Sequence, residues 1–253
     1  MATSRTIEEQ FGPVAAEYAA FDYHASGPDL AVLLEAARMS GRERVLDVGS
    51  GPGNTALLLA PQASRVVALD PTGPMLAEGR RRAIERGLDN VGFERGMAED
   101  LPFPEDHFDR VTSRQSAHHY ADVQAAMREI ARVLTADGRF LLIDSVSPED
   151  DEFDAFLDRI ERLRDPTHVR NHRVSEWRAF FDDVGFDFEE RAMWTLRLDF
   201  DAWVARSRTS LDAVASLRAC FREASARARE RFDVDRHGNW SLPISLMVGT
   251  PRR

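Results

Sequence analysis

The feature that most constrains the fold of this chain is an apolar run that leads into three alternating glycines. The run at 45–48 is followed by the turn Gly-Ser-Gly-Pro-Gly at 49–53, and a helical pattern begins at Asn54. Glycines in such a turn let the backbone reverse sharply and approach a ligand without obstruction by a Cβ atom. A strand, a glycine-rich turn and a helix in this order are typical of doubly wound α/β folds that bind nucleotide cofactors.

The rest of the chain continues the alternation of short apolar strands and helical segments. Strands that alternate with helices are joined by crossovers, so the sequence predicts a mostly parallel sheet covered by helices. An amphipathic helix after Ser147 and a mostly helical segment at 200–231 interrupt the pattern. We expect strands at 44–48, 66–69, 91–95, 109–113, 139–145, 188–196 and 243–248, and helices at 7–20, 28–39, 54–59, 75–86, 123–134 and 174–184.

Length and composition fit one domain. The 253 residues are 43% hydrophobic and 30% charged, and no linker or repeat divides them. We expect a single domain over 1–253, with N-terminal lid helices at 1–42, a cofactor-binding core at 43–147 and substrate-covering insertions at 148–175 and 197–240. The N-terminal helix and segment 150–170 are expected to close over the site as a mobile lid, with two fixed walls as the alternative.

Charge and targeting signals argue against a nucleic acid or a membrane as the partner. The net charge is −10 and the longest basic run is Arg80–Arg82 on an expected helix, whereas phosphate binding needs a concentrated basic face. The chain has no apolar stretch of membrane-spanning length and no secretory signal at its N-terminus. We therefore expect a cytoplasmic monomer or homodimer that acts on a small molecule.

A second strand ends in a carboxylate, Asp70, about 20 residues beyond the glycines, where doubly wound folds hold a ribose diol. The glycines follow the spacing Gly-x-Gly-x-Gly rather than the Gly-x-Gly-x-x-Gly of dinucleotide sites, and no Lys or Arg stands in the turn. Asp47, at the end of the first strand, is costly to bury without a cationic partner, such as the ammonium of a methionine moiety. These features favour S-adenosylmethionine over a dinucleotide.

Four segments resemble class I methyltransferases of the ubiquinone/menaquinone-methyltransferase-like group: VLDVGSGPGNTALLLA, VVALDPTGPMLAEGR, AEDLPFPEDHFDRVTSRQSAHHY and REIARVLTADGRFLLID. The resemblance covers residues 7 to about 190 and is greatest to a bacterial subfamily with a histidine pair and an RDP-S/T-HVR segment. It implies an α/β, Rossmann-like, doubly wound sheet of seven mostly parallel strands, with an antiparallel last strand and helical lid insertions. It also implies methyl transfer from S-adenosyl-L-methionine to a small-molecule O-, N- or C-nucleophile, which yields S-adenosyl-L-homocysteine.

The same resemblance assigns contacts to the cofactor. Asp47 lies near its amino group, the glycines line its methionine and ribose portions, Asp70 takes the ribose hydroxyls, and Ala98 offers its backbone to the adenine ring. Relatives often carry an Asp where this chain has Met97, and the sequence leaves open whether Glu99 is a ligand or a solvated acid. The residues expected to bind the cofactor are Tyr18, Asp47, Gly49, Gly51, Gly53, Asp70, Met75, Ala98 and Arg114.

The expected reaction end is the histidine pair, His118 and His119, which follows the strand at 109–113. Methyl transfer from a sulfonium is an in-line displacement, so the protein aligns the acceptor, excludes water and accepts a proton where the acceptor carries one. A neutral imidazole suits the last role, and Asp144, which ends the next strand, is its expected orienting partner. We take His118, Asp144 and His119 as candidate catalytic residues, with a purely positioning role in the loop as the alternative for each histidine.

A metal site is not expected. His168 and His172 have the i, i+4 spacing of two ligands on one helical face, but no third ligand follows, and a proline two residues before His168 indicates a turn. The single Cys220 excludes a cysteine-based zinc site. Asp165, His168 and Arg170 are expected to form a polar edge of the lid.

The sequence leaves two other classes of function open. One is an NAD(P)-dependent oxidoreductase, which uses the same type of fold for different chemistry. The other is a catalytically silent module that retains the cofactor fold, because a fold does not establish turnover.

Overall fold

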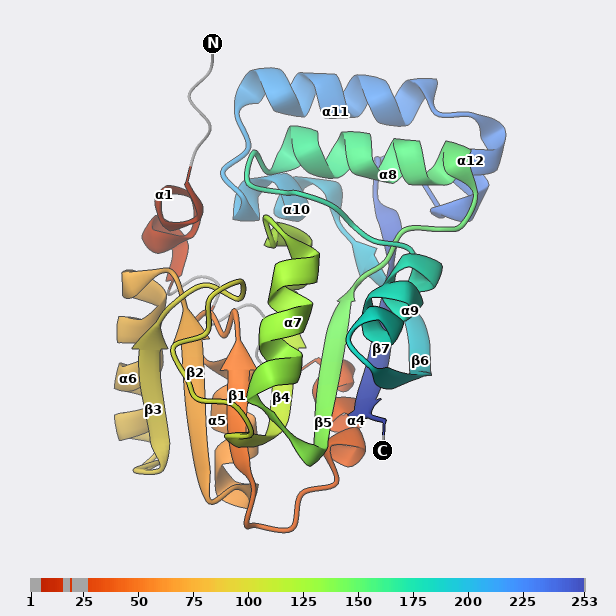
Figure 1. Cartoon of the computed structure of the whole chain (residues 1–253). Helices are drawn as coiled ribbons and strands as arrows, with labels where there is room; N and C mark the ends of the chain where they lie inside the picture. Colours follow the sequence, from red (N-terminus) through yellow and green to blue (C-terminus); the bar gives the residue numbers. More distant parts are fainter. Residues whose placement is uncertain (1–5, 16–18, 20–26, 253) are drawn as a thin grey trace.

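The computed structural model describes residues 6–15, 19 and 27–252 (Figure 1). A seven-stranded sheet crosses the molecule in the order β3-β2-β1-β4-β5-β7-β6. Only β7 runs antiparallel to its neighbours, β5 and β6, which confirms the predicted mixed sheet. The strands are β1 Arg44–Val48, β2 Arg65–Asp70, β3 Val91–Arg95, β4 Phe108–Arg114, β5 Leu134–Ser145, β6 Phe186–Leu198 and β7 Trp240–Pro251.

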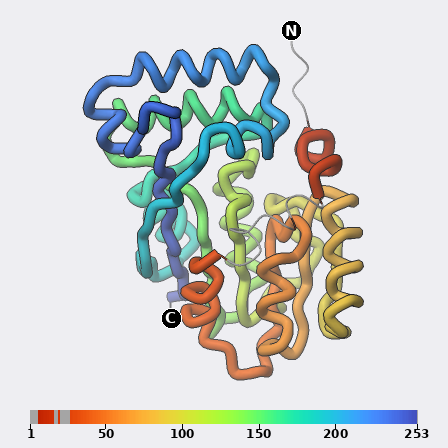
Figure 2. The backbone as a smooth tube through the Cα atoms, turned by 180° about the vertical axis from the view of Figure 1, so that it is seen from behind, coloured from red at the N-terminus to blue at the C-terminus, as the bar shows by residue number. Residues whose placement is uncertain are grey.

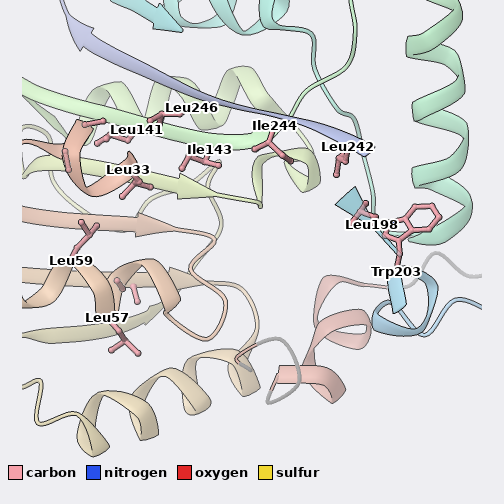
Figure 3. Packing of buried hydrophobic residues seen from close by; sticks show 14 of the residues in the cluster. Leu33, Leu57, Leu59, Leu141, Ile143, Leu198, Trp203, Leu242, Ile244 and Leu246 are labelled. Carbon is pink, nitrogen blue, oxygen red and sulfur yellow. The ribbon is translucent and has the colours of Figure 1, made fainter. Parts of the chain in front are cut away.

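Helices cover both faces of the sheet (Figures 1 and 2). On one face lie α4 (Pro28–Ala37), α5 (Asn54–Leu59) and α6 (Gly73–Glu85), and on the other lie α7 (Val123–Val133) and α9 (Val174–Asp183). Successive residues of β5 alternate between the two layers, because Leu141 and Ile143 join one hydrophobic cluster and Leu142 joins the other. Figure 3 shows part of the first cluster. Burial on both faces explains why the strands are almost continuously apolar.

The insertions lie beyond the carboxyl ends of the parallel strands (Figure 1). They form α8 (Asp151–Arg164), α10 (Phe200–Arg206), α11 (Leu211–Glu223) and α12 (Ala226–Arg231). α8 packs against α11 and α12, and its buried Leu157 and Ile160 belong to the same hydrophobic cluster as α5 and β7. The insertions therefore extend the core of the sheet. No helix in the described ranges is long and apolar enough to cross a membrane.

The predicted helix at 7–20 is interrupted by a 3₁₀ turn within the described residues, and Ala15 and Ala19 beyond the turn are again helical. A capping box formed by Thr6 and Glu9 begins α1, which covers only Ile7–Phe11 and passes into a 3₁₀ turn at Gly12–Val14. Pro13 has no N–H for an α-helical hydrogen bond, and its ring would clash with the carbonyl four residues earlier. Residues 16–18 and 20 of the predicted helix lie outside the description.

Candidate active site

A pocket lies at the carboxyl ends of β1, β2 and β4, between α1 on one side and α8 and α10 on the other. Open α/β sheets bind ligands at this edge because the connecting loops diverge there. Among the residues predicted to bind the cofactor, those that line the pocket are Gly49, Gly51, Asp70, Met75, Ala98 and Arg114. Tyr18 lies outside the described residues.

The glycine turn forms the floor of the cofactor half. All three glycines have positive φ, between 52° and 75°, where other residues are strained. A Cβ at Gly49 would overlap Ser116 Oγ at 2.4 Å, whereas a Cβ at Gly51 would meet nothing within 4 Å. Gly53 forms the N-cap of α5 and does not line the pocket. Gly51 therefore leaves open space on the ligand side, Gly49 allows Ser116 to pack closely, and Gly53 supplies the positive φ that begins α5.

Asp70 ends β2 at the rim of this floor. Its Oδ2 accepts a hydrogen bond from Gly51 N and its Oδ1 accepts one from Thr72 N, each at 2.8 Å. Burial raises the pKa of the carboxyl, while these bonds favour its charged form. The carboxylate is thus held rigidly against the glycine turn and faces the pocket.

Asp47 lies beneath the pocket rather than in its wall. Thr112 Oγ1 donates to its Oδ1 at 2.8 Å, and Ala56 N donates to its Oδ2 at 3.1 Å. Burial raises the pKa of Asp47 to about 7. In this structure Asp47 joins β1 to α5 and β4, and its contact with a cofactor ammonium stays a prediction.

Arg114 has a structural partner that the sequence analysis did not anticipate. Its Nε donates to Asp29 Oδ2 at 2.6 Å and its Nη2 donates to Asp29 Oδ1 at 3.1 Å. Both side chains are almost fully buried. The bidentate pair fixes the first turn of α4 to the end of β4, so the charge of Arg114 is already balanced before any ligand binds.

Four residues that line the pocket each have a buried polar atom with no hydrogen-bond partner among the described residues. The atoms are Ser50 Oγ, Asn54 Oδ1, Glu99 Oε2 and Gln115 Nε2. Buried polar groups are rarely left unpaired, because each loses its hydration without compensation. The set includes a primary amide donor, two acceptors and a hydroxyl, so it fits a polar ligand with several hydrogen-bonding groups.

Sequence reasoning did not select these four residues. Gln115 shows why, since its φ of 55° is unusual for a residue with a side chain and holds it at the end of β4. No local sequence pattern reports that conformation. The structure shows what holds Glu99 at the pocket: its Oε1 accepts a hydrogen bond from Ala121 N at 2.8 Å, while its Oε2 is buried without a partner.

His118 and Asp144 form a buried pair at the end of β4 and β5. His118 Nδ1 donates to Asp144 Oδ1 at 2.6 Å, and His118 N donates to Asp144 Oδ2 at 3.1 Å. Burial opposes the charge on the imidazole, but the adjacent carboxylate outweighs burial and raises the pKa of His118. Because Nδ1 is engaged, Nε2 is the ring nitrogen left for a molecule in the pocket.

His119 is held differently. Its Nδ1 donates to Thr167 O at 3.0 Å, and the ring of Phe11 contacts it edge-on with centroids 5.2 Å apart. Burial and the neighbouring His118 lower the pKa of His119 to about 4, so it is neutral near pH 7. These contacts join the loop after β4 to the segment after α8 and to α1, which favours the positioning alternative for His119.

The segment after α8 forms the expected polar edge without a metal cluster. Asp165 Oδ1 accepts from Thr167 N and from Thr167 Oγ1, and Arg170 pairs with Asp154. His168 stacks near His118 with ring centroids 5.5 Å apart, and it lies outside any helix. The described residues contain no group of three or more side chains that could hold a metal ion.

Comparisons with known proteins identify the family. Residues 46–142 match a family model described as "Methyltransferase domain". Over 243 residues the chain is 40% identical to YcgJ of Bacillus subtilis, an uncharacterized methyltransferase, and the alignment covers 96% of each chain. This chain belongs to the class I methyltransferases.

Solved structures agree with this assignment and confirm the predicted family. The crystal structure of Bacillus subtilis YcgJ superimposes on the methyltransferase described here with a TM-score of 0.86 at 38% identity, covering 88% of this chain and 98% of that chain. A second relative found by sequence alone, YafE of Escherichia coli, is an uncharacterized protein. It is 36% identical over 199 residues, which are 79% of this chain and 96% of YafE. Geranyl diphosphate C-methyltransferase of Streptomyces coelicolor shares the fold, with a TM-score of 0.65 at 17% identity over 99% of this chain and 86% of that chain.

The other half of the methyltransferase pocket is built by the insertions. One wall is apolar and comes from β6, β7 and α10, where Figure 3 shows Leu198, Leu242 and Trp203 near one another. Another part of the lining is polar and comes from the end of α8 and from α10. Its residues are Glu161, Arg164, Asp165 and Arg206. The sequence indicated that these insertions cover the site, but their helical periodicity does not show which residues face it.

Proposed function

We propose that this methyltransferase uses S-adenosyl-L-methionine and transfers the methyl group to a small molecule held beside His118. One observation carries the proposal: a single pocket joins the glycine turn and Asp70 to the His118–Asp144 pair. The cofactor half and the acid–base pair therefore belong to one site. An in-line displacement needs this arrangement, because the methyl donor and the acceptor must lie on opposite sides of the transferred group.

The cofactor half fits S-adenosyl-L-methionine. Asp70 accepts hydrogen bonds from the ribose hydroxyls, Gly51 leaves room for the ligand, and the backbone of Ala98 lies at the adenine edge. The four unpaired polar atoms of Ser50, Asn54, Glu99 and Gln115 provide further partners for its amino, carboxyl and adenine groups. When bound, the cofactor supplies a sulfonium-linked methyl group. The Streptomyces enzyme that shares the fold was crystallised with S-adenosyl-L-homocysteine.

The acceptor half supports proton transfer at His118. Asp144 holds Nδ1, which fixes the orientation of the ring and leaves Nε2 to accept a proton from an acceptor O–H or N–H as the new bond to carbon forms. Asp144 then stabilises the imidazolium. With an acceptor that loses no proton, the same ring orients the nucleophile. Leu198, Leu242 and Trp203 also line the pocket, and their apolar surface helps to exclude water.

A thermal-shift comparison tests this function. S-adenosyl-L-homocysteine at about 100 times its Kd should stabilise the protein by about 2.7 kcal/mol, whereas NAD and NADP should leave Tm unchanged. Gly51→Val should abolish the shift, because a branched side chain fills the open side of the turn. A shift with NAD or NADP and none with S-adenosyl-L-homocysteine would favour the oxidoreductase alternative.

Transfer of labelled methyl from S-adenosyl-L-methionine to a small-molecule extract addresses turnover separately. Label in a product that depends on the protein supports the enzyme. Binding of the cofactor product without any labelled acceptor would favour a silent module.

A further inference from the structure

We infer that the acceptor carries a carboxylate, and that Arg164 at the end of α8 binds it. The inference rests on the proposed function, since it names the class of molecule that occupies the acceptor half. It arises from a guanidinium that is almost buried, lines the pocket and keeps most of its hydrogen-bonding capacity unused.

Arg164 is held in place by only part of its guanidinium. Its Nε donates to Trp203 O at 3.3 Å, and the group lies over the Trp203 ring at 5.5 Å from the ring centroid. The side chain is 11% exposed. Neither Nη atom donates a hydrogen bond to any of the described residues within normal distance, so the fork is oriented by Trp203 and free to bind a planar anion.

Glu161 is the nearest acid, but it is a weak counterion for Arg164. The distance from Arg164 Nη1 to Glu161 Oε2 is 3.7 Å, which is too long for a hydrogen bond. Burial raises the pKa of Glu161, although Arg164 and His118 oppose that effect, so its neutral form is favoured more than in water. A buried cation with an incomplete counterion is unfavourable until a ligand supplies the missing charge.

The other charged groups around Arg164 are already engaged. Asp165 accepts two hydrogen bonds from Thr167 through Oδ1, and Arg206, which also lines the pocket, has contacts of its own. A carboxylate beside Arg164 therefore displaces no existing ion pair at hydrogen-bond distance.

The apolar lining of the pocket indicates the rest of the acceptor. Leu196, Leu198 and Leu242 add an apolar surface to the same pocket. Such a surface favours a hydrocarbon or aromatic body between the carboxylate and the atom that is methylated. The geometry thus describes an apolar acid whose nucleophile lies toward His118.

Three probes of similar size and different charge test the inference: benzoate, benzamide and benzylamine. Each is titrated by calorimetry into the wild-type protein saturated with S-adenosyl-L-homocysteine. Benzoate should bind at least about tenfold more tightly than either other probe, which corresponds to about 1.4 kcal/mol. Arg164→Gln should remove this preference. The matched control Arg159→Gln, on an exposed position of the same helix, should retain it.

Several results would overturn the inference. They are tightest binding of benzylamine, equal binding of the three probes, absence of benzoate binding at millimolar concentration, or an undiminished preference for benzoate in Arg164→Gln. If Arg164→Gln does not fold, the comparison of the three probes on the wild-type protein alone decides whether the acceptor half prefers a carboxylate. Affinity for S-adenosyl-L-homocysteine is measured first in every protein. If the wild type does not bind it, the proposed function fails; if it binds and only the benzoate preference is missing, only the carboxylate assignment fails.

Discussion

The two helices that flank the pocket, α8 and α1, are attached to the protein in different ways. α8 has 14 residues, buries Leu157 and Ile160 completely and is tied down by Asp154, which pairs with Arg170 and Arg173. α1 has five residues, and among them only the polar Gln10 is buried. Gln10 donates to Ser207 O at 2.9 Å, and Glu8 forms an exposed ion pair with Arg95. α8 therefore belongs to the hydrophobic core, whereas α1 lies against the core.

This difference separates two roles that the sequence analysis combined in one mobile lid. We propose that α8 is a fixed wall that shapes the acceptor half, because moving it would expose core residues. α1 is the element that can open, since segments with few buried apolar contacts have low local stability. Phe11 places α1 against His119, so opening there would admit ligands directly to the histidine pair.

The largest expected effect comes from α8. Leu157→Ala should lower the free energy of unfolding by about 3 kcal/mol, because it leaves a cavity in a fully buried site. Urea denaturation measures the change. Leu211→Ala on α11, whose side chain is 87% exposed, is the control and should change stability by less than about 0.5 kcal/mol. A small effect of Leu157→Ala would mean that α8 is not part of the core.

The next largest effect is expected on the rate of turnover, at His118 in the pocket between the two helices. His118→Ala should lower turnover by about 100-fold, with little change in cofactor affinity, because it removes the proton acceptor. Wild-type turnover should rise with pH through a pKa above about 6.5, since only the neutral imidazole accepts a proton and Asp144 raises its pKa. Asp144→Asn should move this limb to lower pH. An unchanged rate in His118→Ala would exclude the assigned role.

The smallest expected effect on stability comes from α1. Phe11→Ala should lower the free energy of unfolding by less than Leu157→Ala does, because the Phe11 side chain is partly exposed whereas that of Leu157 is fully buried. It should weaken binding of S-adenosyl-L-homocysteine about fivefold, since Phe11 lines the pocket. Calorimetry gives the affinity and denaturation gives the stability. A large loss of stability would place α1 in the core with α8.

The sequence was most informative where structure is local. Strand periodicity located all seven strands, and β1 and β3 begin and end where the sequence predicted. The alternating glycines and Asp70 lie together because a strand, a turn and the next strand bring them to one edge of the sheet. Pro13 indicated that α1 would end early, but the prediction of one helix over 7–20 did not take it into account.

The sequence was least informative where distant segments meet. Arg114 pairs with Asp29, which lies 85 positions away in the chain. Arg164 and Glu161 enter the pocket only because α8 packs against α11, and that packing decides which side of the helix faces inward. Periodicity predicts an amphipathic helix but not the orientation of its polar residues. The acceptor half therefore depends on tertiary packing far more than the cofactor half does.

Calorimetric titration with S-adenosyl-L-homocysteine, comparing the wild type with Asp70→Ala, tests the central claim that this pocket holds the methyl donor. Asp70 is fixed at the pocket rim by Gly51 and Thr72, and its loss removes charge-assisted hydrogen bonds to the ribose. The account predicts binding to the wild type and at least about tenfold weaker binding to the variant, a loss of about 1.4 kcal/mol. Circular dichroism checks that the variant is folded. Equal affinities of the two proteins, or no binding to the wild type, would contradict it.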